Sequence, residues 1–290
     1  MRYSPSPPLL LLRRFVRSIE FNGFRGALTH SFQRFYRSLR QHGPGGVFAR
    51  AFIKAPVLPV ANPPEPRPPH PFDVLHGTDT GGFISGANMP AATLSAIYTT
   101  VCLGIAPSAL QSALAALPVK YEDFTFVDVG CGKGRALLIA AEFPFQRLVG
   151  IEITSELSRV SQANLALFPQ WKDRISVVNQ DAVRFVYPDT PLVLFLYNPF
   201  LTPVFRRVLA NLVRQLRQSP RRVYLLFADI YADLDRLRND KPVYAAVMDS
   251  FSSITNLSES IYHLNAEELA VEPSRCTVNR ISLYSIDVTR

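Results

Sequence analysis

The sequence predicts an α/β fold, a mostly parallel β-sheet with helices on both faces. From Phe124 onward, short apolar runs alternate with longer amphipathic stretches, and a glycine-rich turn follows the first apolar run. Strands that alternate with helices of this length favour parallel βαβ units. The apolar content of 48% over 290 residues is ample for one large or two modest domains.

The expected elements follow one another closely along this part of the chain. They are strand 124–127, helix 136–142, strand 147–151, helix 155–167 with Ser155 as N-cap, strands 175–179 and 192–197, helix 203–218 and strand 222–227. Upstream, two helix-like stretches, 91–103 and 108–117, are expected to cover the open edge of the site. Downstream, the runs 243–248 and 281–286 complete the sheet.

The segment VDVGCGKGR, Val127 to Arg135, carries the strongest functional signal. It places Asp128 at the end of a buried strand and glycines at positions 130, 132 and 134 in the turn that follows, with Cys131 as a small residue between them. Glycine has no Cβ to block close approach, and the next helix presents its N-terminal amides to the same crevice. We expect this turn to lie flat against a ligand.

Three kinds of nucleotide site compete for this turn. A P-loop needs glycine five positions before the Gly-Lys pair and Ser or Thr after it, but Val127 and Gly134 stand there. The dinucleotide fingerprint needs a third glycine where Arg135 stands, which weakens that interpretation but leaves it open. The third interpretation is an adenosine site with an acidic residue two positions before Gly-x-Gly-x-Gly.

Polar residues also follow the next three strands, where a doubly wound sheet presents its ligand-contacting groups. Glu152 lies 22 positions after Gly130, and its carboxylate can accept hydrogen bonds from both ribose hydroxyls, while Asp181-Ala182 follows the third strand. The fourth strand ends in Tyr197 followed by Asn198-Pro199-Phe200. For each carboxylate taken singly, a helix N-cap or a solvated loop charge is the competing explanation.

With these motifs, residues 72–230 resemble a group of bacterial class I S-adenosylmethionine-dependent methyltransferases. Shared features are Phe-Asp-x-x-x-Gly-x-Asp-Thr at residues 72–80, Gly-Lys-Gly-Arg at 132–135, Phe-Pro-Phe at 143–145 and Tyr-Asn-Pro-Phe at 197–200. The resemblance implies a Rossmann-like class I methyltransferase fold with a seven-stranded sheet that ends in a hairpin with one antiparallel strand. A Tyr-x-Pro-Thr-Pro segment of the family is absent; Tyr98-Thr99-Thr100 stands instead, so the cover over the methionine end is expected to differ.

The resemblance also implies the cofactor, S-adenosyl-L-methionine, and the residues that contact it. The cofactor-binding set is Asp128, Gly130, Cys131, Gly132, Gly134, Arg135, Glu152, Asp181 and Ala182, and in this family the position of Asp181-Ala182 holds the adenine. The expected catalytic set is Tyr197, Asn198, Pro199 and Phe200, in which an amide and a proline-stiffened carbonyl aim the lone pair of an acceptor amine. The motif resembles Asn-Pro-Pro-Tyr of amino-group methyltransferases with one proline missing, and a proline turn that merely closes the strand is the alternative. We therefore expect N-methylation of a protein side chain or a small-molecule amine.

Composition divides the chain into three regions: a basic amphipathic N-terminal extension (1–54), a Pro-rich linker (55–71) and a methyltransferase domain (72–290). Residues 1–54 contain ten Arg or Lys and one acidic residue, whereas residues 55–290 contain 21 Arg or Lys and 22 acidic residues. Leu28, Phe32, Phe35 and Leu39 recur at helical spacing, which favours packing on the main domain or attachment to an anionic membrane surface.

The near neutrality of residues 55–290 makes a nucleic-acid partner unexpected. Three widely spaced cysteines and five scattered histidines indicate neither a disulfide framework nor a metal site. We expect a cytoplasmic protein, with a peripheral membrane location as the alternative. The competing functions are a cofactor-binding peripheral membrane or scaffold protein with little activity and an NAD-dependent oxidoreductase.

Overall fold

The computed structural model describes residues 68–85, 89, 94–231, 245–263 and 278–288. The chain divides into two units, one of residues 69–85 and 100–290, the other of 1–68 and 86–99. In the second unit, Leu94–Ile97 forms the short helix α3. The expected N-terminal extension, its membrane attachment and nearly all of the linker lie outside the described residues and stay predictions, as does the domain boundary at residue 72.

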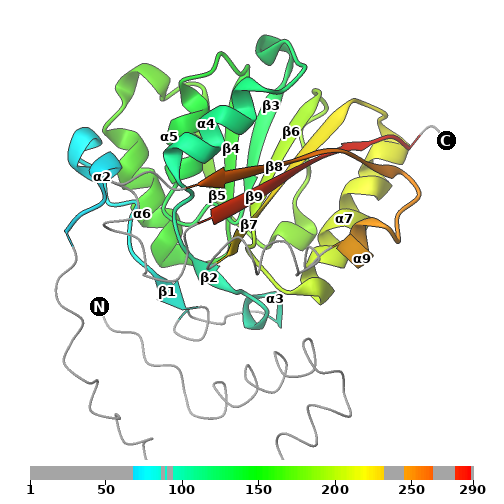
Figure 1. Cartoon of the computed structure of the whole chain (residues 1–290), viewed down its shortest axis with the longest axis horizontal. Helices are drawn as coiled ribbons and strands as arrows, with labels where there is room; N and C mark the ends of the chain where they lie inside the picture. The colour runs from blue at the N-terminus through cyan, green and yellow to red at the C-terminus, as the bar shows by residue number, and fades with distance from the viewer. Residues whose placement is uncertain (1–67, 86–88, 90–93, 232–244, 264–277, 289–290) are drawn as a thin grey trace, which may run out of the picture. The chain divides into compact units, whose positions relative to one another are not determined.

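A seven-stranded sheet organises the larger unit (Figure 1). Its order is β5-β4-β3-β6-β7-β9-β8, and β9 alone runs antiparallel to its neighbours. The strands are β3 (Thr125–Val129), β4 (Arg147–Glu152), β5 (Ile175–Asn179), β6 (Leu192–Tyr197), β7 (Val223–Tyr231), β8 (Ile254–His263) and β9 (Val278–Ile286). The predicted α/β architecture, with a mostly parallel sheet and a final hairpin, is confirmed.

Helices cover both faces of this sheet. On one face α4 (Pro107–Ala115) and α5 (Arg135–Ala141) share a buried cluster with Phe126, Phe195 and Leu226 from three strands. On the other face lies α7 (Thr202–Gln218), whose Phe205 ring is 5.6 Å from the ring of Phe227. Successive strand residues point to opposite faces, so Leu226 packs against the helices on one face of the sheet and Phe227 against α7 on the other. Two further helices are α6 (Ser155–Ala166) and α9 (Ala245–Met248).

Several sequence-based expectations need correction. Of the helix expected over 91–103, only Leu94–Ile97 is helical in the described part, and Val101–Cys102 forms β2, paired with β1 (Ile84–Ser85). The β-branched run 99–101 disfavours a helix there. The expected helix 108–117 is observed as α4, which packs on α5 within the core cluster, and its cover of the open edge of the site stays a prediction.

The C-terminal hairpin and one cap also differ from expectation. In the described part of the run 243–248, Ala245–Met248 forms the helix α9 rather than a strand, and β9 pairs with β7 and β8. β8 lies at the sheet edge and is largely exposed, so its sequence, ITNLSESIYH, carries little of the apolar signal that marks a buried strand. The N-cap of α6 is Thr154 rather than Ser155.

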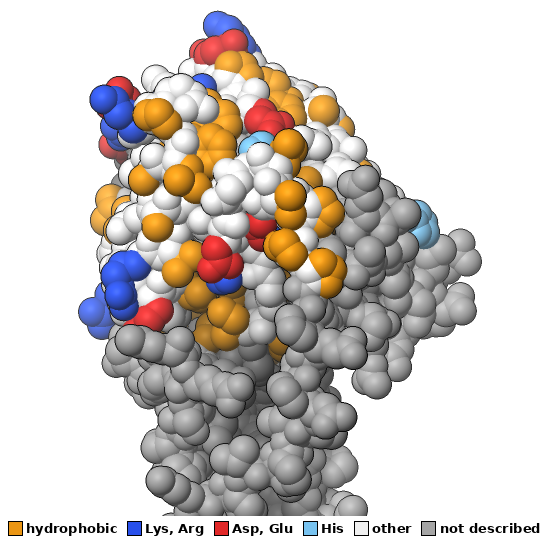
Figure 2. Space-filling view, turned by 90° about the vertical axis from the view of Figure 1, so that its left-hand side faces the viewer, with side chains coloured by type: hydrophobic (Ala, Val, Ile, Leu, Met, Phe, Trp, Pro, Cys, Tyr) orange, Lys and Arg blue, Asp and Glu red, His pale blue; other side chains and the backbone are white. Residues whose placement is uncertain are grey.

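The entry to the larger unit is a short helix, α2 (Pro71–His76), which ends at Gly77 in a left-handed conformation. On the face drawn in Figure 2, hydrophobic side chains lie in small groups among charged and polar atoms. Among the helices of the described residues, none has the length and apolar character needed to cross a membrane.

Candidate active site

The predicted site residues come to one edge of the sheet because β3, β4, β5 and β6 are parallel. In the register of the sheet, Asp128 lies beside Gly150 of β4 and Phe195 of β6, and Glu152 lies beside Asn179 of β5. The chain order reverses at β3, whose neighbours are β4 and β6. Ligands of open α/β sheets bind at such a reversal, outside the carboxyl ends of the strands.

The glycine turn is tightly packed by other parts of the chain. A Cβ on Gly130 would lie 2.5 Å from Cβ of Pro199, one on Gly132 would lie 2.8 Å from Sγ of Cys102, and one on Gly134 would lie 2.4 Å from Oγ of Ser161. Gly130 also has φ of 86°, which side-chain-bearing residues rarely adopt. Internal packing therefore explains the three glycines, and the turn alone does not argue for a ligand.

The argument for a bound ligand rests instead on two buried carboxylates at the turn. Asp128 is 3% exposed and Glu152 is 6% exposed. Burial, followed by the nearby Glu152 carboxylate, raises the pKa of Asp128 to about 8. Burial also raises the pKa of Glu152, although hydrogen bonds from backbone amides oppose that shift. Within the described part of the chain, Asp128 has no hydrogen-bond partner, so its carboxyl group is available to a ligand that donates hydrogen bonds.

Glu152 holds the glycine turn and the start of the next loop through hydrogen bonds to backbone amides. Its Oε2 accepts a hydrogen bond from the amide of Gly132 at 2.9 Å, and its Oε1 accepts one from the amide of Thr154 at 2.8 Å. The amides of Gly130 and Cys131 donate to the carbonyl of Ile151 at 2.8 and 3.0 Å. These four amides already have acceptors in the chain, so they do not form the open amide cradle that binds phosphate at a P-loop.

Both cations next to the turn have partners elsewhere. Lys133 Nζ lies 2.5 Å from Oδ1 of Asp79. Arg135 is 2% exposed; its Nε donates to Oγ1 of Thr80 at 2.9 Å, and its Nη2 lies 3.8 Å from Oδ2 of Asp73. The guanidinium of Arg135 thus holds the entry segment, residues 70–82, and its expected contact with a cofactor stays a prediction.

Asp73 organises the entry segment. Its carboxylate accepts hydrogen bonds from the hydroxyls of Thr78 and Thr80 and from the amides of Thr80 and Gly81, at 2.5–2.8 Å. Burial opposes ionisation, but the hydrogen bonds from Thr80 and Thr78 outweigh it and the pKa of Asp73 is lowered. Asn164 of α6 bonds both the amide and the carbonyl of Asp79 at 2.9 Å. The Phe-Asp segment recognised in the sequence therefore contacts both the glycine turn and α6.

The turn after β6 lies against the glycine turn. Asn198 has φ of 43°, a left-handed conformation that asparagine tolerates better than most residues. Thr100 donates its hydroxyl to the carbonyl of Asn198 and its amide to the carbonyl of Pro199, the latter at 3.2 Å. Nothing in the sequence around Thr100 signals this contact, which spans nearly 100 residues.

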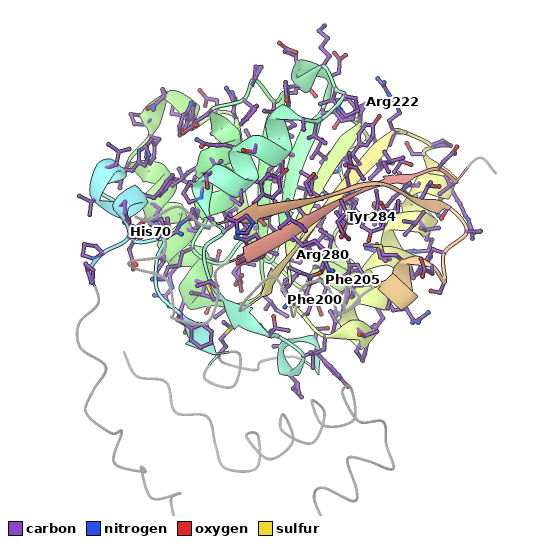
Figure 3. All side chains as sticks on the ribbon, viewed as in Figure 1. His70, Phe200, Phe205, Arg222, Arg280 and Tyr284 are labelled. Atoms are coloured by element: carbon purple, nitrogen blue, oxygen red, sulfur yellow. The ribbon has the colours of Figure 1, made fainter. Side chains whose placement is uncertain are left out.

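The two aromatic residues of this turn have different surroundings. Phe200 is 8% exposed, and its ring lies 6.3 Å from the ring of Phe205 in the α7 core. Figure 3 labels both residues. Tyr197 is half-buried and its hydroxyl donates to Oδ1 of Asn279 at 3.0 Å.

The remaining candidates lie at neighbouring strand ends. Oδ1 of Asp181 accepts the amide of Val183 at 3.0 Å and so caps a short 3-10 helix, Ala182–Arg184, within which Ala182 is buried. Cys131 is 7% exposed, and burial raises the pKa of its thiol, as do Asp128 and Glu152. The capping role expected as the alternative for Asp181 is thus observed, while its contact with adenine stays a prediction.

Two further carboxylates that could act as bases, Asp229 and Asp79, are both paired with cations. Oδ2 of Asp229 lies 3.3 Å from Nη2 of Arg280, and burial raises the pKa of Asp229 to about 6 against the opposing effect of Arg280. Asp79 pairs with Lys133. Among the described residues, no group of His, Cys, Asp and Glu side chains has the arrangement of a metal site.

No protein-family model matches this chain, and no curated protein matches it. Solved structures of similar shape include the YcgJ protein of Bacillus subtilis, with 14% identity, a TM-score of 0.42 and coverage of 62% of this chain and 98% of that one. A SAM-dependent O-methyltransferase of Thermotoga maritima is 16% identical, with a TM-score of 0.42 and coverage of 64% of this chain and 67% of that one. A geranyl diphosphate C-methyltransferase of Streptomyces coelicolor is 12% identical, with a TM-score of 0.42 and coverage of 63% of this chain and 79% of that one. Likeness at this level identifies neither a family nor a substrate.

Proposed function

We propose that this chain is an S-adenosyl-L-methionine-dependent methyltransferase. The observation that carries the proposal is the pair of buried carboxylates, Asp128 and Glu152, at the ends of adjacent parallel strands beside the glycine turn. Burial and mutual repulsion raise the pKa of Asp128, and no cation contributes an opposing effect. A ligand with hydroxyl and ammonium donors and a positively charged sulfur would offset both the cost of burying these carboxylates and their mutual repulsion.

The same features argue against an NAD-dependent oxidoreductase. A pyrophosphate needs free amides or cations at the turn, whereas the amides of residues 130–132 have acceptors and Lys133 and Arg135 are paired. In the proposed complex Glu152 binds the ribose hydroxyls, Asp128 faces the positively charged end, and Asp181-Ala182 holds adenine.

When bound, the cofactor supplies a methyl group activated by a positively charged sulfur. The protein's task is then to orient an acceptor and exclude water, which can supply about 7 to 11 kcal/mol of the barrier. Pro199 is packed against Gly130, and Thr100 holds the carbonyls of Asn198 and Pro199. These contacts hold the backbone of the turn after β6 against the glycine turn.

We assign Asn198 and Pro199 to aligning a nitrogen nucleophile, with Tyr197 at its side and Phe200 supporting the turn from the core. A lysine amine has an ordinary pKa of about 10.4, so presenting it unprotonated at neutral pH costs on the order of 4 kcal/mol. Because Asp229 is paired with Arg280 and Asp79 with Lys133, an acceptor that is already neutral suits the site better.

The test is transfer of a tritiated methyl group from S-adenosylmethionine to extract of a strain that lacks this protein. The labelled product is separated into protein, nucleic-acid and small-molecule fractions. We expect transfer by the wild type and its loss in Asp128→Ala and Glu152→Ala. Asp79→Ala, which removes a carboxylate with a side chain 69% exposed from the same region, is the matched control and should retain transfer. Equal transfer by all four proteins would remove the basis of the proposal.

A further inference from the structure

A polar cavity lies near the amino ends of the parallel strands, whereas the candidate active site lies at their carboxyl ends. It has a volume of about 290 Å³ and is lined by Arg184, Tyr187, Asp189, Arg214, Gln218 and Arg221, among others. Arg221 and Arg222 precede β7, so this edge carries the amino ends of the parallel strands. In Figure 3, Arg222 and Phe200 mark the two opposite edges.

Arg221 is the buried cation of this cavity. Its side chain is 5% exposed, and its guanidinium donates to the carbonyls of Ser219 and Tyr187 at 2.6 and 3.4 Å. The carboxylate nearest to it, Asp189, lies 3.9 Å away with a side chain that is 87% exposed. Solvent screens such a pair, so the buried charge is incompletely neutralised.

Two buried donors in the cavity wall also lack partners. Nε of Arg221 and the hydroxyl of Tyr187 make no hydrogen bond within the described residues, although both atoms are buried. Tyr187 is 2% exposed. An unpaired buried polar atom is costly, so the contacts within the chain do not fully satisfy the side chain of Arg221.

The surrounding charge is strongly positive. Residues 214–222, from the last turns of α7 to the residue before β7, contain four arginines and no acidic residue. Arg214, which is one of them, and Arg184 line the cavity with exposed side chains. The near neutrality of residues 55–290 as a whole conceals this local excess.

These features select a compact anion. Guanidinium groups bind phosphate oxygens through paired hydrogen bonds, which a carboxylate-poor cavity permits. The volume is at the small end of ligand pockets, about 300–1,000 Å³, and exceeds the space of a phosphate alone. A long polyanion would need an open, flat surface rather than a cavity with a buried arginine.

We propose that this cavity binds the phosphate group of a compact ligand, free phosphate or a small phosphate monoester, through Arg221, Arg214 and Arg184. The proposal does not depend on the proposed methyltransferase activity, because its readout is binding at a separate site.

Calorimetric titration of the full chain with inorganic phosphate, ribose 5-phosphate, ribose and an RNA decamer without terminal phosphates tests it. We expect ribose 5-phosphate to bind and ribose not to bind, and the comparison with inorganic phosphate shows whether the sugar contributes. Arg214→Gln should weaken binding about tenfold, the effect of losing one charge-assisted hydrogen bond, and Arg184→Gln should weaken it several-fold.

Arg217→Gln is the matched control, because Arg217 is exposed on the same helix and is not among the cavity-lining residues. It should change the affinity by less than about twofold. The proposal is overturned if neither phosphate binds, if Arg217→Gln weakens binding as much as Arg214→Gln, or if the RNA decamer binds more tightly than ribose 5-phosphate.

Discussion

Replacement of Asp128 by asparagine should stabilise the free protein while abolishing cofactor binding. The substitution keeps the shape of the side chain and removes its ionisable group. Asp128 is almost fully buried, and burial together with Glu152 raises its pKa to about 8. Unfolded chains ionise this residue near its ordinary value of 3.8. Between those values the folded protein binds one proton more than the unfolded chain.

The free energy of unfolding of the wild type should therefore fall as pH rises from about 4 to about 8, by up to about 1.4 kcal/mol per pH unit from this group. From pH 5 to pH 7 the loss amounts to roughly 3 kcal/mol. Asp128→Asn removes this contribution, so the slope should shrink by about one proton. Part of the slope should remain, because the pKa of Glu152 is also raised.

Urea unfolding of wild type and Asp128→Asn at pH 5, 6, 7 and 8, without cofactor, measures the two slopes. Asp79→Asn, which removes an exposed carboxylate, controls for the loss of one charge. Parallel pH dependences for wild type and Asp128→Asn would refute the reasoning, since they would mean that Asp128 ionises equally in both states.

Three further substitutions test the packing of the site. Gly130→Ala should destabilise the protein by about 2 kcal/mol more than Gly82→Ala in urea unfolding, because both glycines have φ near 87° but only Gly130 is in contact with a proline ring. Asp73→Asn should cost about 2 kcal/mol at pH 7, and the difference from wild type should shrink below pH 4, because the lowered pKa of Asp73 means that its stabilisation is lost on protonation. Arg280→Met should cost about 3–5 kcal/mol at pH 8 and less at pH 5, where Asp229 is protonated; an equal loss at both values would contradict the ion-pair explanation.

Local sequence patterns predicted the central strands well. The runs 175–179 and 192–197 match β5 and β6 in full, because each is apolar and is bounded by polar or turn residues. The amphipathic period of 203–218 matches α7 to within one residue. Parallel strands then bring Asp128 and Glu152 to one edge, which the chain order alone implies.

What the sequence could not predict depends on contacts between distant segments. Arg135 was assigned to the cofactor, yet its guanidinium reaches Thr80 and Asp73, more than 50 residues earlier in the chain. The glycines were expected to permit approach of a ligand, whereas side chains from other segments occupy the space beside them. The exposed edge strand β8 was missed because polar residues dominate it.

Calorimetric titration of the wild-type protein with S-adenosylhomocysteine, followed by displacement with reduced nicotinamide cofactor, tests the account most directly. The buried carboxylates and the engaged turn amides predict that S-adenosylhomocysteine binds at one site, that reduced nicotinamide cofactor does not displace it, and that Asp128→Asn and Glu152→Gln lose the binding. Binding of the nicotinamide cofactor in preference to S-adenosylhomocysteine, or unaltered affinity in both variants, would contradict it.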